Sequence, residues 1–201
     1  VVNEHIPVLL KLLRMKRTQD EGGHYIIDNK NNGDSIWHIA AFHAKLRVIR
    51  DEKLLMHLPT PLIVNHFGQS ILHRVCRGQY HEDERLKIVE FILDRFPAEK
   101  SYLLRAKDNA GCSVLWHAVN SGLFAIAKYL METEDMRSIL DDGPSSPLWM
   151  ACNFGDRAMV ELLMAHGADP MKKSADGLSC LSMVLLKDHV NIMRSRSILN
   201  I

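Results

Sequence analysis

The chain has 201 residues, of which 47% are hydrophobic and 24% are charged, a balance typical of a folded protein and not of a disordered one. Its 25 basic and 24 acidic side chains leave a net charge of +1, which gives no electrostatic reason to expect nucleic acid as a partner. With no 18-residue apolar run and no N-terminal secretion signal, we expect no direct membrane insertion.

The chain opens with a stretch that has the pattern of a helix. Residues 5–15 place valines and leucines three and four positions apart, which predicts one apolar stripe. We assign residues 1–27 to an N-terminal helical cap or a partial repeat. Because the chain starts at Val1 and not at Met, we expect it to be a fragment of a longer protein.

From residue 33 onward, a glycine followed closely by a serine and an apolar run recurs in five copies. The serines are Ser35, Ser70, Ser113, Ser146 and Ser179. Their spacings of 35, 43, 33 and 33 residues are typical of a repeat array, in which each unit covers the apolar face of its neighbour.

Each copy predicts the start of a helix. A serine hydroxyl at this position can accept a hydrogen bond from a backbone N–H of the first turn. The glycine before it permits a tight turn with positive φ. Pro147 follows Ser146 at the first helical position, where a missing N–H costs nothing. The helices that begin at the third and fourth copies are expected to end at Gly122 and Gly155.

A second apolar stripe follows these first helices. In the fourth copy it runs from Met159 to Leu163, while Arg157 and Glu161 fall on the opposite face. Gly167 then marks the end of this second helix. The sequence therefore predicts helix–turn–helix units.

The repeat array is expected to span residues 28–192 and to be followed by a C-terminal tail over 193–201. The interval of 43 residues exceeds the period of 33 by ten, and we place insertions near 79–83 and 97–101. The expected repeat starts lie near residues 30, 65, 108, 141 and 174.

These helix starts resemble the ankyrin repeat, whose signature is Thr-Pro-Leu-His within a unit of about 33 residues. Serine replaces the threonine in every copy, and the histidine is kept at His38 and His73. The most similar copy begins Ser146-Pro-Leu-Trp and ends Gly167-Ala-Asp-Pro. The resemblance implies an all-α ankyrin-repeat solenoid with helical caps, which binds proteins and catalyses no reaction.

We find no catalytic or cofactor-binding motif in the sequence, such as a P-loop, a dinucleotide fingerprint or H-E-x-x-H. The resemblance implies that His38 and His73 form hydrogen bonds within and between repeats. His73 and Cys76 have the spacing of a metal-binding pair, but a zinc site needs two more ligands. We therefore expect no enzyme activity, no cofactor and no metal.

The four cysteines contain no C-x-x-C pair, so we interpret them as free thiols in a reducing compartment, the cytoplasm or the nucleus. Cys76 and Cys152 fall at a small-residue packing position between repeats. Cys112 lies in the turn before a cap, where we expect exposure. Three tryptophans in first helices are expected in the core, although an indole edge could instead reach the surface; they are Trp37, Trp116 and Trp149.

The resemblance also implies a concave groove, made of turn tips and first helices, as the docking surface. Carried over by register, the partner-binding candidates are Phe42, His43, Phe67, Gln69, Arg77, Asn109, Asn120, Asn153 and Phe154. The three phenylalanines carry most of this prediction, because an aromatic side chain at these positions has no core to fill.

We expect a non-catalytic module that binds another protein or a domain of the same protein. Two alternatives stay open. The stretch from Gly33 to His43 resembles the first repeat of inhibitor-of-NF-κB proteins, which mask a Rel-type transcription factor. Ankyrin segments are also often attached to kinases, acyltransferases, glutaminases, ubiquitin-ligase receptors and ion channels, so this one could regulate such a protein.

Overall fold

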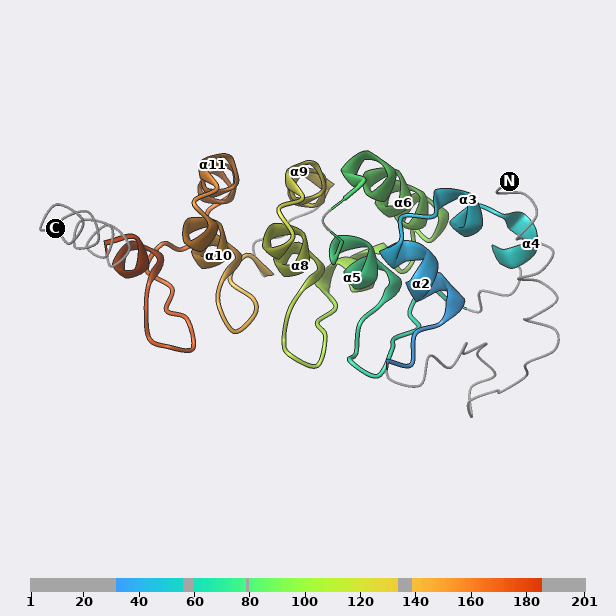
Figure 1. Ribbon diagram of the computed structural model, residues 1–201, viewed down its shortest axis with the longest axis horizontal. Helices are drawn as coiled ribbons and strands as arrows, with labels where there is room; N and C mark the ends of the chain where they lie inside the picture. The colour runs from blue at the N-terminus through green and yellow to red at the C-terminus, as the bar shows by residue number, and fades with distance from the viewer. Residues whose placement is uncertain (1–31, 56–59, 79, 134–138, 186–201) are drawn as a thin grey trace, which may run out of the picture.

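The computed structural model describes residues 32–55, 60–78, 80–133 and 139–185. The predicted N-terminal cap and C-terminal tail lie outside these residues. Within them, pairs of helices stack side by side along one long axis, with hairpin turns projecting to one side (Figure 1). None of the helices in this part of the chain is long and apolar enough to cross a membrane.

Each repeat unit consists of a first and a second helix. The first helices are α2 (Ile36–Phe42), α5 (Ile71–Cys76), α8 (Val114–Asn120) and α10 (Pro147–Phe154). The second helices are α3 (Leu46–Ile49), α6 (Glu82–Arg95), α9 (Phe124–Thr133) and α11 (Arg157–Ala165). Two further short helices are α4 (Glu52–Leu55) and α7 (Lys100–Arg105), and residues 180–185 form the described part of a fifth first helix.

The predicted caps form at the starts of the first helices. Ser113 and Ser146 accept hydrogen bonds from backbone N–H groups three residues later, and Ser35 and Ser70 form capping boxes with the histidine at that position. The glycines that precede the caps have positive φ, as predicted. At Gly33, φ is +65° and a Cβ would lie 2.4 Å from the His66 ring, so the turn requires glycine.

The core runs between first and second helices along the whole stack. Its largest fully buried side chains are Leu54, Leu72, Ile88, Leu93, Leu103, Leu104, Leu115, Leu123, Ile126, Leu130, Leu148 and Met159. The predicted stripe of α11 is confirmed, since Met159 and Leu163 are buried while Arg157 and Glu161 form an exposed ion pair. Each helix pair thus buries its apolar side against its neighbours.

The long second unit contains three features that the sequence pattern did not indicate. α6 begins at Glu82, whose carboxylate accepts a hydrogen bond from the backbone N–H of Ala125 at 2.6 Å and so caps α9. The buried Arg85 donates to the carbonyls of Val75 at 2.6 Å and Phe42 at 2.7 Å. These contacts satisfy carbonyls at the ends of α5 and α2. The third feature is the short helix α7, which the sequence pattern did not predict.

Candidate protein-interaction surface

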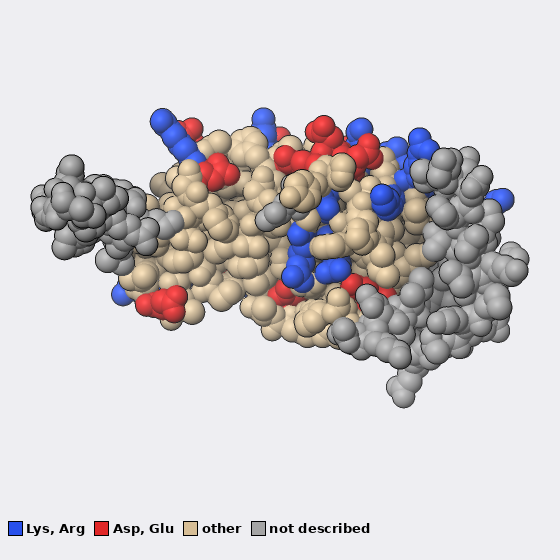
Figure 2. Space-filling view, in the orientation of Figure 1, with Lys and Arg blue, Asp and Glu red and all other residues tan. Residues whose placement is uncertain are grey.

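The hairpin turns and the first helices together line one face of the solenoid. Figure 2 shows basic side chains gathered near the middle of this view, around α5 and α8, and acidic side chains gathered over α6 and α9. Phe67 at a turn tip is 47% exposed and Phe154 at the end of α10 is 55% exposed. His43 and Arg77 are also exposed, and Asn120 and Asn153 are half-buried.

Phe42 does not stand free as the sequence pattern suggested. It is half-buried, and the guanidinium carbon of Arg74 lies 4.5 Å from the centre of its ring. Arg74 is in turn held by the carboxylate of Asp34 at 2.8 Å. The expectation that an aromatic side chain here lacks a packing partner was wrong, because the neighbouring repeat supplies a cation that stacks on it.

Gln69 is another candidate that the structure corrects. It is only 4% exposed, so it does not offer a surface to a partner. Its amide nitrogen donates to Asp108 at 3.3 Å, and its amide oxygen accepts a hydrogen bond from Arg77 at 3.1 Å. Gln69 therefore positions the exposed Arg77 side chain and joins two repeats.

The turn tips are tied to one another by hydrogen bonds. The exposed Asn109 donates from its side chain to the carbonyl of His66 at 3.0 Å, and from its backbone to the carbonyl of Phe67 at 2.9 Å. The backbone N–H of His66 donates to the carbonyl of Asn32 at 3.0 Å. These bonds fix the turn that carries Phe67 relative to both neighbouring turns.

The buried His38 connects two repeats, as the resemblance implied. His38 accepts from Ser35 at Nδ1 and donates from Nε2 to the carbonyl of Gln69, 2.9 Å away in the next repeat. His73 makes the same Nδ1 contacts with Ser70, but its Nε2 has no hydrogen-bond partner among the residues that the structure describes, so the expected bond to the next repeat is not formed there. Burial lowers the pKa of both His38 and His73 to about 4, so these rings are neutral near pH 7.

Three potential metal ligands, Asp108, Cys112 and His117, place their donor atoms within 4.8 Å of one another. Hydrogen bonds already occupy Asp108, which accepts from His117 at 2.9 Å and from the backbone N–H of Ala110 and of Cys112. Burial alone would raise the pKa of Asp108, but these hydrogen bonds hold it below its usual range. We interpret this cluster as a junction between repeats and not as a metal site.

The two free cysteines are both buried. The expectation that Cys112 is exposed was wrong, because its turn packs against the neighbouring repeat; burial and the Asp108 charge raise the pKa of its thiol to about 11. Cys76, which the metal-like spacing with His73 had singled out, is fully buried, and burial raises its pKa to about 12. Neither thiol is activated for chemistry.

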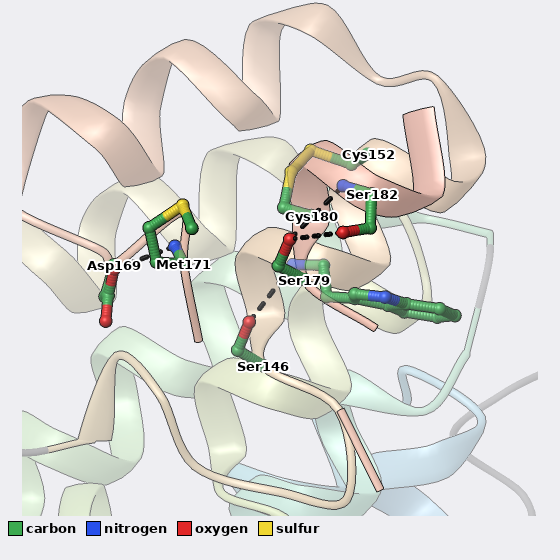
Figure 3. The surroundings of a disulfide bond; sticks show 8 residues. Ser146, Cys152, Asp169, Met171, Ser179, Cys180 and Ser182 are labelled. Carbon is green, nitrogen blue, oxygen red and sulfur yellow. Dashed lines mark hydrogen bonds between the residues drawn. A yellow bond between two sulfur atoms is a disulfide. The ribbon is translucent and has the colours of Figure 1, made fainter. Parts of the chain in front are cut away.

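The other two cysteines correct the prediction that every thiol is free. Cys152 in α10 and Cys180 at the start of the next first helix form a disulfide, with their Cα atoms 6.2 Å apart (Figure 3). The sequence separation of 28 residues carries no C-x-x-C signal. The repeat register alone does not predict the pair either, because this separation is shorter than the 33-residue spacing of Ser146 and Ser179.

The tryptophans are divided between the two interpretations that the sequence allowed. Trp37 is buried in the core. Trp116 is half-buried, and its indole N–H donates to the carbonyl of Ser145 at 2.8 Å, which connects the third and fourth units. The half-buried Trp149 has no hydrogen-bond partner for its indole nitrogen among the residues that the structure describes.

Stacked helix pairs with serine-capped starts and hairpin turns define an α-helical repeat solenoid. Residues 84–174 match the family model described as ankyrin repeats in three copies, so this segment belongs to the ankyrin-repeat family. The remaining described helices continue the same stack (Figure 1). Ankyrin repeats are a non-catalytic fold that mediates protein–protein interaction.

The chain is similar to parts of two palmitoyltransferases. It is 33% identical over 86 residues to palmitoyltransferase ZDHHC13 of Homo sapiens, a match that covers 42% of this chain and 14% of that protein. It is 31% identical over 84 residues to palmitoyltransferase ZDHHC17 of Rattus norvegicus, covering 41% and 14%. The matched segment is thus a small part of each relative.

Proposed function

We propose that this chain is a recognition module that holds a segment of another protein, or of another domain of its own protein, in the groove between the hairpin turns and the first helices. The observation that carries the proposal is the exposure of Phe67 at a turn tip and of Phe154 at the end of the first helix α10. Exposed aromatic side chains gathered on one face of a folded domain favour a partner site.

The surroundings of these side chains support binding because they are fixed before a partner arrives. The turn of Phe67 is hydrogen-bonded to both neighbouring turns, and Arg77 is held by Gln69. A surface that is already ordered loses less conformational entropy on binding. Phenylalanine supplies apolar area and arginine supplies directed hydrogen bonds, and both side chains suit the centre of an interface.

Partner capture with variants tests this proposal. The double variant Phe67→Ala/Phe154→Ala should fold normally and lose its partner. Phe42→Ala is left out, because Phe42 packs under Arg74 and its loss would disturb the fold. Met164→Ala is the matched control, since Met164 is an exposed apolar side chain on the second helix α11. Equal capture by the double variant and the control would remove the groove as the site.

A second candidate function is favoured by the relatives. The chain would then be the recognition segment of a palmitoyltransferase, which selects proteins for the acyl-transfer domain. The sequence flanking this segment in its gene decides this directly, because an acyl-transfer domain would have to follow or precede it. No comparison favours the inhibitor-of-NF-κB alternative, which a binding assay with a Rel dimer would test.

The cellular location also remains a proposal. We propose the cytoplasm or the nucleus. The free thiols of Cys76 and Cys112 are typical of such reducing compartments, whereas the Cys152–Cys180 disulfide is typical of an oxidising one. A fluorescent fusion of the whole protein, imaged beside a secretory-pathway marker, tests it. Signal confined to the secretory pathway would contradict the proposal.

A further inference from the structure

A cavity of about 430 Å³ lies where α7 meets the hairpin turn of the second unit. Its walls are Leu62, Val64, Gly68, Ser70, Ser101, Tyr102, Leu103, Arg105, Ala106 and Lys107, which we call the α7 pocket. None of the groove residues proposed above lines it. The pocket exists because the long second unit inserts α7 before the hairpin turn of the third unit.

The apolar part of the pocket is unusually open to solvent. Val64 is 56% exposed and Tyr102 is 64% exposed, and they line the same cavity from two different elements. Both side chains are held in place. Val64 lies in an antiparallel bridge with Ser70. Tyr102 belongs to α7, which is anchored by the fully buried Leu103 and Leu104. Exposed apolar area on a fixed frame favours a docked partner.

The charge of the pocket has one sign. Two of its ten lining residues, Arg105 and Lys107, are cations and none is acidic, although the chain as a whole has a net charge of only +1. Lys107 is partly neutralised by Asp142, whose carboxylate lies 2.8 Å from its ammonium group. Arg105 lies exposed in the last turn of α7 and has no carboxylate within ion-pair distance in the described part of the chain.

We propose that the α7 pocket docks an acidic segment of a partner polypeptide, which inserts one apolar side chain between Val64 and Tyr102 and places a carboxylate against Arg105. Charge complementarity specifies the acidic character of the occupant. A polypeptide suits the site because both apolar walls are more than half exposed, so the occupant needs further contacts outside the cavity. The proposal goes beyond the groove and does not rest on it.

A peptide titration of the isotope-labelled 201-residue chain tests the proposal by NMR. The probe is the synthetic peptide Gly-Ser-Glu-Leu-Glu-Ser-Gly, and its counterpart has lysine at both glutamate positions. The glutamate peptide should shift the amide signals of residues 62–70 and 101–107 in a saturable way. The lysine peptide should bind at least about tenfold more weakly, since like charges then face each other.

Two tyrosine variants separate docking from unspecific contact. Tyr102→Ser should weaken binding of the glutamate peptide about tenfold, the typical loss for an aromatic anchor. Tyr80→Ser is the matched control, because Tyr80 is even more exposed but lies outside the pocket. Arg105→Glu should weaken binding further. Circular dichroism confirms that each variant is folded, which we expect because both tyrosines are exposed.

Several results would overturn the proposal. They are shifts that leave residues 101–107 unchanged, equal binding of the two peptides, unchanged affinity of Tyr102→Ser, or no saturable shift at millimolar peptide. The Phe67→Ala/Phe154→Ala variant should bind the glutamate peptide as the unaltered chain does. Failure of the groove proposal and failure of the pocket proposal are therefore distinguishable.

Discussion

The junctions at the two ends of the described stack use different chemistry on the same backbone geometry. Between the first and second units, a buried ion pair joins Arg74 to Asp34 at 2.8 Å, and a neutral histidine reaches a carbonyl of the next repeat. Between the fourth and fifth units, the Cys152–Cys180 disulfide makes the connection. A repeat fold fixes which elements meet, but not which chemistry holds them together.

The difference predicts two separate sensitivities. The stability of a junction made of buried charges and neutral histidines depends on pH, because protonation places a positive charge on a buried histidine ring. A junction made of a disulfide depends on the redox state. Hydrogen exchange resolved along the chain can follow both in one sample, since opening of a repeat need not involve the whole stack.

The largest effect is expected at the buried ion pair. Arg74→Met should lower the free energy of unfolding by about 3–5 kcal/mol, because it leaves the Asp34 carboxylate buried without its cation. Lys87→Met is the control and should have a small effect on stability, because Lys87 and its partner Glu84 are both about half exposed. Urea denaturation measures both. A loss below about 1 kcal/mol for Arg74→Met would show that the pair does not hold the junction.

The disulfide should contribute somewhat less. Closing a loop of this length is worth about 3.5 kcal/mol in the chain-entropy account. A reductant should therefore speed hydrogen exchange in α10 and in residues 180–185, while α2 and α5 stay unchanged. Cys152→Ser/Cys180→Ser should show the fast exchange with or without reductant. Equal acceleration at both ends of the stack would contradict separate junctions.

The histidines give a pH dependence of defined sign. Their pKa is about 4 in the folded chain and near 6.5 when unfolded, so between these values only the unfolded state binds the proton. Stability should fall as pH drops from 6.5 to 4, by up to about 1.4 kcal/mol per pH unit for each of His38 and His73. Near His38, the Asp34 charge raises and the Arg74 charge lowers its pKa.

Urea denaturation between pH 6.5 and pH 4 tests the sign of this dependence. The variant His38→Gln should remove the contribution of one histidine to the slope of the unfolding free energy against pH. A variant with the slope of the unaltered chain would show that His38 is already charged when folded. Burial also lowers the pKa of His117 beside His73, so the comparison is made between variants and not on the absolute slope.

The smallest effect is expected at the exposed ion pair of α11. Arg157 and Glu161 lie 2.8 Å apart, the same distance as the buried pair, but both side chains are mostly in solvent. Glu161→Gln should change the free energy of unfolding by less than about 0.5 kcal/mol. A loss of unfolding free energy as large as that of Arg74→Met would mean that burial does not explain the difference in stability between the two ion pairs.

The sequence predicted what depends on short-range chemistry. Serine caps, positive-φ glycines and the stripe of α11 follow from residues a few positions apart, so the pattern alone indicated them. It missed what depends on contacts between units. Gln69 is buried and donates a hydrogen bond to Asp108 of the next repeat, and Phe42 is covered by Arg74. α7 lacked a signal because it is one short insertion without a second copy.

Photo-crosslinking tests the central claim, that the groove and not the outer face holds the partner. The photoreactive p-benzoylphenylalanine replaces Phe67 in one variant and Met164 of α11 in another, and both are irradiated in cells. We expect one or more defined protein adducts from position 67 and none from position 164. Adducts from position 164 together with none from position 67 would contradict the account.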